Sequence, residues 1–383
     1  MADVEAGPTV QPELVFGLVE PLGTDLSLVA ARLADALTQV RYGNNILDVP
    51  VAWAHNRTMD NGNAGKPSLH DAILYFADYQ HCHNFMVGLR WPDGKVKCPE
   101  CAAEKVCYLA KNRVWKCYAT HPKPRFTLKT GTIFEDSPIG LEKWLPAVWM
   151  LLNSKNGISS WELHRALSVT QKTAWFMLHR IRLAMQEGSF GKMGGPVEAD
   201  ETYVGGKAEF MHLDKRTRRK MQGELNRGPV GKAIVLGLLD RETRKARVKV
   251  LKTVRKIELR AEVADNVEQG ATVYTDALKS YRGLKLDGFI HDFIDHAEAY
   301  VRDQVHTNGL ENFWSLLKRA LKGTYVSVEP FHLQAYCDER AFRYNNRTMD
   351  DLHRFVSGMR QVIGRRIMYK DLIGAMETET ACG

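Results

Sequence analysis

The sequence predicts an α/β protein in which a small metal-stabilised ribbon and a helical segment precede a mixed sheet. Three observations lead to this prediction. Three cysteines and a histidine between residues 98 and 121 have the spacing of metal ligands. A helical stretch at 141–185 is interrupted by a short turn. Beyond a glycine-rich break at 188–196, three strand patterns come first, and helix and strand patterns then alternate.

Composition narrows the class of protein. The chain has 383 residues, a formal net charge of +8 and a pI near 9.0, which favours a polyanionic partner such as nucleic acid. No apolar run reaches the ~18 residues that a membrane span needs, and no secretory signal is visible. Seven cysteines, an odd number, argue against a disulfide framework. We therefore expect a cytoplasmic protein with no membrane partner.

Residues 1–65 form a first segment whose role the sequence does not reveal. A strand pattern at 13–19 and a Pro-Gly turn precede an amphipathic helix with Leu26, Leu33 and Leu37 on one stripe. This order resembles the start of a nucleotide-kinase domain, but the loop lacks the Lys-Ser/Thr ending of a P-loop. We interpret the segment as an accessory or fused piece that leads into an Asn- and Gly-rich linker.

Residues 66–130 are predicted to contain a zinc ribbon. Cys98 and Cys101 are two residues apart, and Cys117 is followed by His121 with three residues between them. Two turns with this spacing present four ligands at tetrahedral angles around one ion, and metal binding supplies the folding energy that two small hairpins lack. The alternatives are that Cys107 or the segment 81–83 replaces His121, or that these thiols are unrelated.

Residues 131–190 are predicted to be helical, with a helix-turn-helix at their centre. Residues 159–167 indicate one short helix, 168–169 a turn, and Thr170 caps a longer helix with a buried apolar stripe. The first turn of that helix would expose Gln171, Lys172 and Thr173 to the edges of bases in a major groove. Arg180 and Arg182 would then contact phosphates. A plain helical hairpin has the same periodicity and stays the alternative.

Residues 197–347 are predicted to form an RNase H-like sheet with helices. The expected strands are 197–204, 232–240, 246–252, 271–276 and 288–295, with a helix at 255–268. Helices at 307–322, 331–345 and 350–363 follow, and 348–383 form a C-terminal helical tail. Three strands followed by alternating helix and strand is the order of an RNase H-like α/β sheet.

Three acidic residues stand at favourable positions in this domain. Strand alternation places Glu198 and Asp200 on one face of the first strand, and Asp276 ends a strand expected beside it. Glu311 lies at the start of a helix, seven residues before Lys318 and therefore on the same helix face. Two strand-end Asp residues and a helix Glu form a hard-oxygen cage that suits a pair of magnesium ions.

Several longer segments resemble one family, the zinc-ribbon insertion-sequence transposases of bacteria. The closest group is the family numbered fifteen-ninety-five, the ISXO-type elements, and the match runs from about residue 68 to about residue 347. The segments that carry the resemblance are Thr130–Ser137, Lys172–Arg180, Asp200–Lys207, Tyr274–Asp276 and His306–Arg319.

The resemblance implies an integrase-like DDE catalytic domain. Its three acids map onto Asp200, Asp276 and Glu311, with Lys318 as the accompanying basic residue. Some relatives have Asn as the third catalytic residue, so Asn308 and Asn312 remain rivals of Glu311.

The resemblance also implies zinc ligands at Cys98, Cys101, Cys117 and a fourth residue. Many relatives have a second Cys-x2-Cys, which would place a cysteine at position 120. Thr120 stands there and His121 follows it, so the identity of the fourth ligand stays open.

The function expected from the resemblance is that of a DNA transposase. It would bind the terminal inverted repeats of an insertion sequence and catalyse strand cleavage and 3′-OH strand transfer with Mg²⁺ or Mn²⁺, while Zn²⁺ stabilises the ribbon. Its partners would be double-stranded DNA, both element ends and target, and further copies of itself in a homodimer or larger synaptic assembly. It would work in the cytoplasm, associated with the nucleoid. The alternatives are a structure-specific RNase H-like nuclease and an inactive, transposase-derived DNA-binding regulator.

Overall fold

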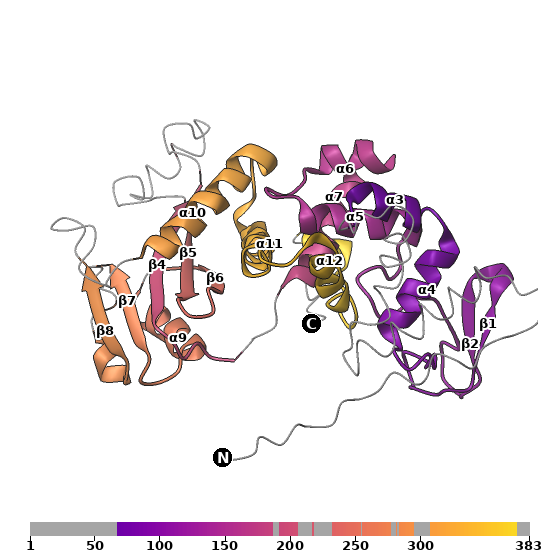
Figure 1. Cartoon of the computed structure of the whole chain (residues 1–383), viewed down its shortest axis with the longest axis horizontal. Coiled ribbons are helices and arrows are strands. Elements are labelled where there is room, and N and C mark those ends of the chain that lie inside the picture. The colour runs from indigo at the N-terminus through magenta and orange to yellow at the C-terminus, as the bar shows by residue number, and fades with distance from the viewer. Residues whose placement is uncertain are drawn as a thin grey trace, which may run out of the picture. The chain divides into compact units, whose positions relative to one another are not determined.

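A computed structural model of the chain describes residues 67–186, 191–205, 217, 232–253, 255–276, 281, 283–294 and 307–373 (Figure 1). By its internal contacts the chain separates into Met1–Ala52 and Trp53–Gly383, and everything described below lies in the second unit. The strand and helix expected within residues 1–65 lie outside the described residues.

The region expected to form the ribbon begins with two helices. These are α3 (Leu69–Phe76) and α4 (Tyr79–Arg90), and each starts at a side-chain cap, Ser68 for α3 and Asp78 for α4. An antiparallel sheet follows, built from β1 (Val106–Leu109), β2 (Val114–Cys117) and β3 (Arg125–Phe126), with a short 3₁₀ turn at Ala110–Asn112. Trp115 of β2 stacks on Phe126 and contacts Tyr108, so aromatic packing supports the small sheet.

The helical segment contains α5 (Leu141–Asn153), α6 (Ser160–Leu167) and α7 (Gln171–Met185). The predicted turn between α6 and α7 is confirmed: Ser168 has a left-handed backbone (φ 49°), and the Thr170 hydroxyl accepts a hydrogen bond from Thr173 N. The predicted apolar stripe of α7, from Ala174 to Met185, is buried. The two-helix geometry is therefore the one expected from the sequence.

A mixed sheet forms the centre of the C-terminal part. Its described strands are β4 (Val197–Val204), β5 (Ala233–Asp240), β6 (Ala246–Leu251), β7 (Thr272–Asp276) and β8 (Ile290–Ile294). Their spatial order is β6-β5-β4-β7-β8, in which β4–β5 and β5–β6 are antiparallel and β4–β7 and β7–β8 are parallel. The predicted adjacency of the first strand and the strand that ends at Asp276 is therefore confirmed.

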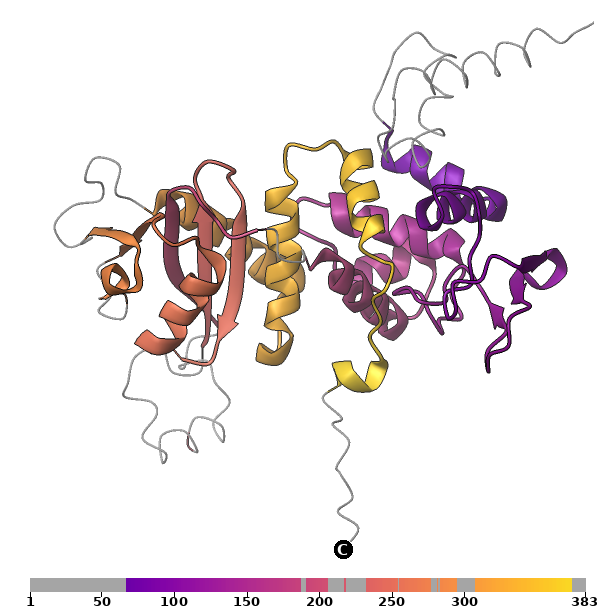
Figure 2. The same ribbon diagram turned by 90° about the horizontal axis from the view of Figure 1, so that it is seen from below.

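Helices cover both faces of this sheet (Figure 2). On one face α9 (Lys256–Asn266) packs Leu259 and Val263 onto Val197 and Ala199 of β4. On the other face lie α10 (Asn308–Ala320), which packs Leu310, Phe313, Trp314 and Leu317, and α11 (Leu333–Asn345). Period-2 alternation along β4 therefore turns Glu198 and Asp200 toward α10.

Shorter elements complete the described chain. They are 3₁₀ turns at Leu284–Asp287 and Pro330–His332, a π-helical turn at Leu321–Tyr325 that continues α10, and the helices α12 (Asp351–Arg360) and α13 (Tyr369–Leu372). No helix among the described residues is long and apolar enough to cross a membrane.

A buried ion-pair network joins α7 to α11. Glu339 is fully buried, and its carboxylate contacts Arg182 Nε at 2.6 Å and an Arg343 nitrogen at 2.5 Å. Burial would raise the pKa of Glu339, but the two guanidinium groups hold it below its usual range. Because losing one partner would leave a buried charge uncompensated, this network holds the two helices in register.

Candidate functional site

Four side chains of the ribbon gather at one point. The ligand atoms of Cys98, Cys101, Cys117 and His121 all lie within 4.8 Å of one another, the one group of its kind among the described residues. The turn at Cys98 closes because Ala102, at φ 59°, donates its N–H to Cys98 O at 2.8 Å. Cys117, at the end of β2, accepts a hydrogen bond from Ala119 N on its sulfur at 3.4 Å.

The geometry of this group fits zinc. Zn–S bonds of about 2.3 Å at tetrahedral angles place two sulfur ligands about 3.8 Å apart. The Cys101 and Cys117 sulfurs are 3.7 Å apart, and the Cys98 sulfur is 3.6 Å from His121 Nε2. The ribbon therefore has the donor set and the spacing of a Zn²⁺ site.

The competing ligands lie elsewhere. Cys107 is exposed and its thiol contacts the carbonyl of Tyr108, while the buried Cys82 thiol donates to Phe76 O. His81 stacks on Tyr75. These positions favour His121 as the fourth member of the group.

The three acids reach one region of the sheet from three elements. The parallel register pairs Val197 with Val273 and Ala199 with Thr275, so Asp200 and Asp276 stand side by side on β4 and β7. Both side chains are partly buried, whereas Glu311, in the first turn of α10, is exposed. Unlike the ribbon ligands, the three carboxylates do not gather within 4.8 Å of one another.

Electrostatics link the three carboxylates. Burial is the largest cause of a raised pKa at Asp200, and the negative charges of Asp276 and Glu311 raise it further. A hydrogen bond from the Trp314 indole opposes these effects. A cluster of carboxylates that repel one another in this way is the donor set that a hard divalent cation stabilises.

Two contacts hold α10 against β4 beside this cluster. The Leu310 N–H, at the start of α10, donates to Glu198 Oε2 at 3.0 Å, and Trp314 Nε1 donates to Asp200 Oδ2 at 2.9 Å. Residues 198 and 200 share a strand face and residues 310 and 314 share a helix face, so the two spacings match. We call this pair of contacts the β4–α10 clamp. It places Glu311, between Leu310 and Trp314, beside Asp200.

Small residues allow the close approach that the clamp requires. A Cβ at Gly309 would lie 2.7 Å from Glu198 Oε2, and one at Gly237 of β5 would lie 2.6 Å from the Trp314 ring. Glu198 itself is fully buried and also pairs with Arg241 Nε at 2.9 Å. No side chain caps the N-terminus of α10 locally, so Glu198 supplies the carboxylate that a helix start favours.

Glu201 is a titratable neighbour that the sequence did not mark for function. It extends from the opposite face of β4, and burial raises its pKa to about 7. The hydroxyl of the fully buried Tyr281 lies beside this carboxyl group, and its interaction with Glu201 opposes the effect of burial. Alternation along the strand predicts the face of Glu201, but not the depth of its burial.

The rivals of Glu311 occupy different positions on α10. Asn312 lies about 100° further around the helix and lines a pocket with several arginines, and Asn308 is exposed at the helix start. Lys318 is exposed two turns beyond Glu311, on the same helix face. The negative charge of Glu311 also acts on Asp200, and this favours Glu311 over either asparagine as the partner of Asp200.

The predicted helix-turn-helix contacts are only partly available at the surface. Lys172 is exposed, with its ammonium 4.9 Å from the centre of the Tyr369 ring, while Gln171 and Thr173 are half-buried. Gln171 Nε2 donates to Ser160 Oγ at 2.8 Å. Lys172 is therefore the member of this turn with the freest access to a ligand.

Two predicted phosphate contacts require correction. Arg180 is 5% exposed and donates to the backbone carbonyls of Ile133 and Glu135. Arg182 is 1% exposed and pairs with Glu339. Amphipathic periodicity does not reveal such burial, because the acceptors come from segments distant in sequence. Neither guanidinium is accessible to a phosphate in this structure.

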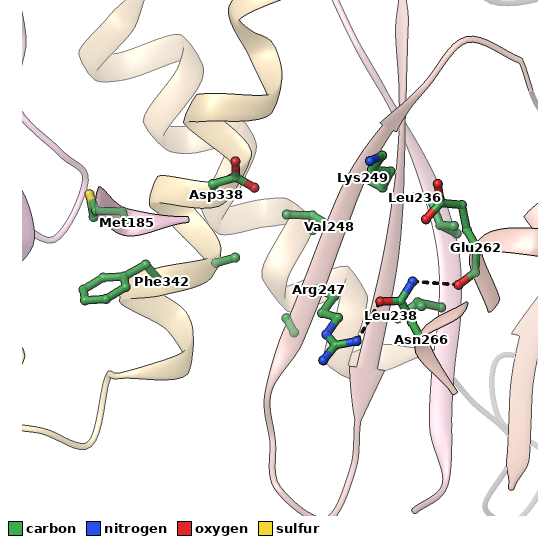
Figure 3. Close-up of a pocket in the computed structure, with 12 residues that line it drawn as sticks. Met185, Leu236, Leu238, Arg247, Val248, Lys249, Glu262, Asn266, Asp338 and Phe342 are labelled. Atoms are coloured by element: carbon green, nitrogen blue, oxygen red, sulfur yellow. Dashed lines mark hydrogen bonds between the residues drawn. The ribbon is translucent and has the colours of Figure 1, made fainter. Parts of the chain in front are cut away.

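A separate pocket lies between β6, α9 and α11, away from the acids (Figure 3). Arg247 and Lys249 line it together with Glu262 and Asp338, and Arg247 donates to Asn266 Oδ1 at 2.7 Å. Because two cations and two carboxylates line it, the pocket has little net charge. It shares no residue with the acidic cluster or the ribbon ligands.

Comparisons with known proteins agree with these observations. Residues 78–120 match a transposase zinc-ribbon domain, and residues 192–345 match an ISXO2-like transposase domain. A protein described as "Uncharacterized protein in transposable element ISH50", from Halobacterium salinarum, is 31% identical over 254 residues, which cover 65% of this chain and 85% of that protein. The three cysteines of the zinc-ligand group lie inside the first matched region, and His121 follows it directly. The helix-covered mixed sheet lies inside the second, and the chain belongs to the ISXO2-like (IS1595) family of zinc-ribbon transposases.

Proposed function

We propose that this transposase binds the terminal inverted repeats of its insertion sequence and catalyses metal-dependent strand cleavage and 3′-OH strand transfer. The observation that carries the proposal is the acidic cluster: Asp200 is electrostatically coupled to both Asp276 and Glu311, and these residues come from three separate elements. Asp200 lies in the middle of β4 rather than at its end, beside Asp276 at the end of the parallel strand β7. Two partly buried acids on adjacent strands, with a third at the start of the helix packed over them, rarely gather without a shared task.

We assign the domain at 197–347 to the RNase H-like fold. The support is the strand order β6-β5-β4-β7-β8 with its first three strands antiparallel, and helices on both faces of the sheet. Residues 66–130 and 131–190 would then be the zinc-ribbon and helix-turn-helix regions, and 348–383 a C-terminal tail.

The acids would hold two divalent cations, Mg²⁺ or Mn²⁺. Asp200 and Asp276 stand where they can share the ions, and Glu311, which is exposed, would turn inward to complete the set. Bound there, the cations would activate the attacking oxygen and stabilise the leaving oxygen of an in-line displacement. Trp314 orients Asp200 for this task by its hydrogen bond to Oδ2.

The remaining residues would position the DNA. Lys318 projects from the face of α10 that carries Glu311, where it can pair with a phosphate close to the reacting one. Lys172, with Gln171 and Thr173 beside it, would meet the element end, and the ribbon would extend that contact. Two ends must be joined in concert, so the working form is expected to be a homodimer or larger assembly.

Strand transfer with a substrate that ends in a free 3′-OH tests this proposal. Asp276→Asn removes one carboxylate charge with little change in shape, so joining is expected to fall by about 10³-fold or more while end binding persists. Asp292→Asn on β8 is the matched control, because Asp292 is exposed on the neighbouring strand, opposite Tyr274. Its joining rate should equal that of the wild type.

The same assay separates the alternatives. A wild-type protein that cuts element ends but never joins them is a structure-specific nuclease. A protein that binds ends but does neither is a transposase-derived regulator. If Asp276→Asn joins ends as fast as the control does, the assignment of the acidic site is wrong.

A further inference from the structure

A second charged site borders α10 on the face next to that of Glu311, about 100° around the helix. Six cationic side chains also line the pocket that Asn312 and Leu316 of α10 border. They come from the segment after α5, the β5–β6 turn, α11 and the turn after it, and α12. These six, which define the arginine pocket, are Lys155, Arg244, Arg340, Arg343, Arg347 and Arg354. Among the residues that the structure describes, no aspartate or glutamate lines the pocket.

Two of these six cations form ion pairs with carboxylates. Arg343 pairs with Glu339, and Arg354 pairs with Asp351 at 3.0 Å. Within the described part of the chain, none of the other four cations has a carboxylate within 4.0 Å. Like charges gathered in one cavity repel each other, so the pocket is electrostatically complementary to an anion.

The floor of the pocket is already built. Arg340 and Arg343 are 6% and 7% exposed. Arg340 donates an N–H to Lys155 O, just beyond the end of α5, and Arg343 donates one to Leu151 O, near the end of α5. These bonds fix both guanidinium planes, yet the buried Nε of each arginine has no hydrogen-bond partner in the part of the chain that the structure describes. Burial and the neighbouring Arg343 also lower the pKa of Arg340 to about 10.

The rim is exposed and adds three more cations. Lys155, Arg244 and Arg347 are all at the surface. Arg347 is held over the Tyr344 ring at 4.4 Å and donates to Arg244 O, so it is oriented while its charge stays accessible. A fixed floor and an accessible rim are the arrangement expected of a binding site rather than of a solvated charge run.

The chemistry of the lining indicates phosphate groups. Planar guanidinium groups bind phosphate oxygens with two parallel hydrogen bonds, whereas a lysine ammonium acts as a point charge. Five arginines and one lysine therefore favour phosphate as the ligand. The pocket has a cavity volume of about 350 Å³ and is partly open to solvent. Such a volume exceeds that of one inorganic ion and suits successive phosphates of a strand.

We propose that the arginine pocket binds the phosphate backbone of the DNA that carries the reacting phosphate. The inference rests on the proposed function, since the acids and the pocket border neighbouring faces of α10. Glu311 projects from one face, and Asn312 projects from the other, about 100° around the helix. A strand that crosses the exposed ridge of α10 reaches both. The pocket therefore anchors DNA beside the acidic site without taking part in the chemistry.

Salt-dependent binding measures this anchoring. The variant Arg244→Gln/Arg347→Gln removes two rim charges and leaves the buried floor intact. Fluorescence anisotropy with labelled end DNA, without added divalent cation, gives the dissociation constant between about 50 and 200 mM salt. Each lost phosphate contact reduces the slope of log K against log salt by about 0.9, so the double variant should lose about 1.8.

The matched control removes the same charge from another face. Arg255 and Lys256 are exposed at the start of α9, on the far side of the sheet from α10. The variant Arg255→Gln/Lys256→Gln should keep the wild-type slope. An equal loss of slope in both double variants would mean that only total charge matters, which would overturn the proposal.

Two further outcomes would also overturn it. One is an unchanged slope and affinity in the pocket variant. The other combines two results: inorganic phosphate stabilises the wild type but not the pocket variant in a thermal shift assay, and the pocket variant binds DNA as the wild type does. The pocket would then be a small-anion site.

These outcomes are distinguishable from failure of the proposed function. If the pocket variant binds DNA as the wild type does, while Asp276→Asn still abolishes joining, only the pocket assignment is wrong. If the wild type fails to join ends, the proposed function itself fails.

Discussion

The two candidate metal sites of this protein are held together by different means. The ribbon group is local in sequence: four ligand atoms from a 24-residue segment, 98–121, lie within 4.8 Å of one another. The acidic cluster draws on β4, β7 and α10, and its carboxylates do not close to that distance. Structural zinc sites are closed by the protein, whereas catalytic sites keep open positions. We infer from this difference that the fold of the ribbon depends on its ion, whereas the geometry of the acidic site depends on the packing of α10 against β4.

The largest effect is expected at the ribbon. Cys117→Ser removes a buried ligand, and structural zinc contributes about 10–16 kcal/mol of apparent binding energy in small zinc-finger peptides. We expect bound zinc to be lost, and amides of β1 and β2 to exchange quickly while those of β4 and β5 stay protected. Zinc analysis and hydrogen exchange measure both effects.

Two controls sharpen this prediction. Cys107→Ser changes an exposed thiol outside the group and should keep one zinc per chain. Withholding magnesium from the wild type should leave the protection of β4 unchanged. If β4 lost its protection without magnesium, the acidic site would depend on its ion as the ribbon does, and the contrast would disappear.

Much of the sheet and of the ribbon can be predicted from the sequence, because the patterns that indicate them lie within short segments. Residues 197–204 alternate clearly enough that the predicted strand has the bounds of β4. The Cys-x2-Cys turn and the Cys117–His121 pair likewise lie within short segments. Period-2 alternation and ligand spacing are local patterns, and their structural meaning does not depend on distant residues.

The features that the sequence did not predict depend on distant partners. The sequence around Arg182 predicts a basic, exposed helix face. The side chain is instead buried, because it pairs with Glu339, which is 157 residues away in the sequence. The same is true of Glu198, whose partner Leu310 N is 112 residues away. The arginine pocket gathers side chains from four separate parts of the chain. Without the fold, none of these charges can be assigned to the surface, the core or a site.

The second largest effect is expected at the β4–α10 clamp. Glu198→Ala removes a buried carboxylate that Arg241 and the start of α10 both use. Breaking a buried pair on one side costs about 3–5 kcal/mol, so the free energy of unfolding should fall by that amount. Urea denaturation measures it, and joining by the folded fraction should fall as well because Glu311 loses its position.

Glu198→Gln is the conservative comparison. It keeps the shape of the side chain and an oxygen that can accept from Leu310 N, but it loses the charge that pairs with Arg241. It should recover part of the stability and most of the joining activity. A Glu198→Ala protein as stable as the wild type would show that the clamp does not hold α10 in place.

The smallest effect is expected at the second contact of the clamp. Trp314→Phe keeps a ring against Gly237 but removes the N–H that reaches Asp200 Oδ2. A hydrogen bond to a charged group is worth about 1.5–3 kcal/mol, so joining should fall by about tenfold or more while zinc content stays unchanged.

A purely structural role of Trp314 would leave the magnesium requirement for joining unaltered. An Asp200 that is no longer oriented should instead raise the magnesium concentration for half-maximal joining. Trp161→Phe, which alters an exposed tryptophan of α6, is the matched control and should change neither quantity. A Trp314→Phe protein with a slower rate but the wild-type magnesium requirement would limit Trp314 to packing, and Glu198 alone would then link the sheet to the acidic site.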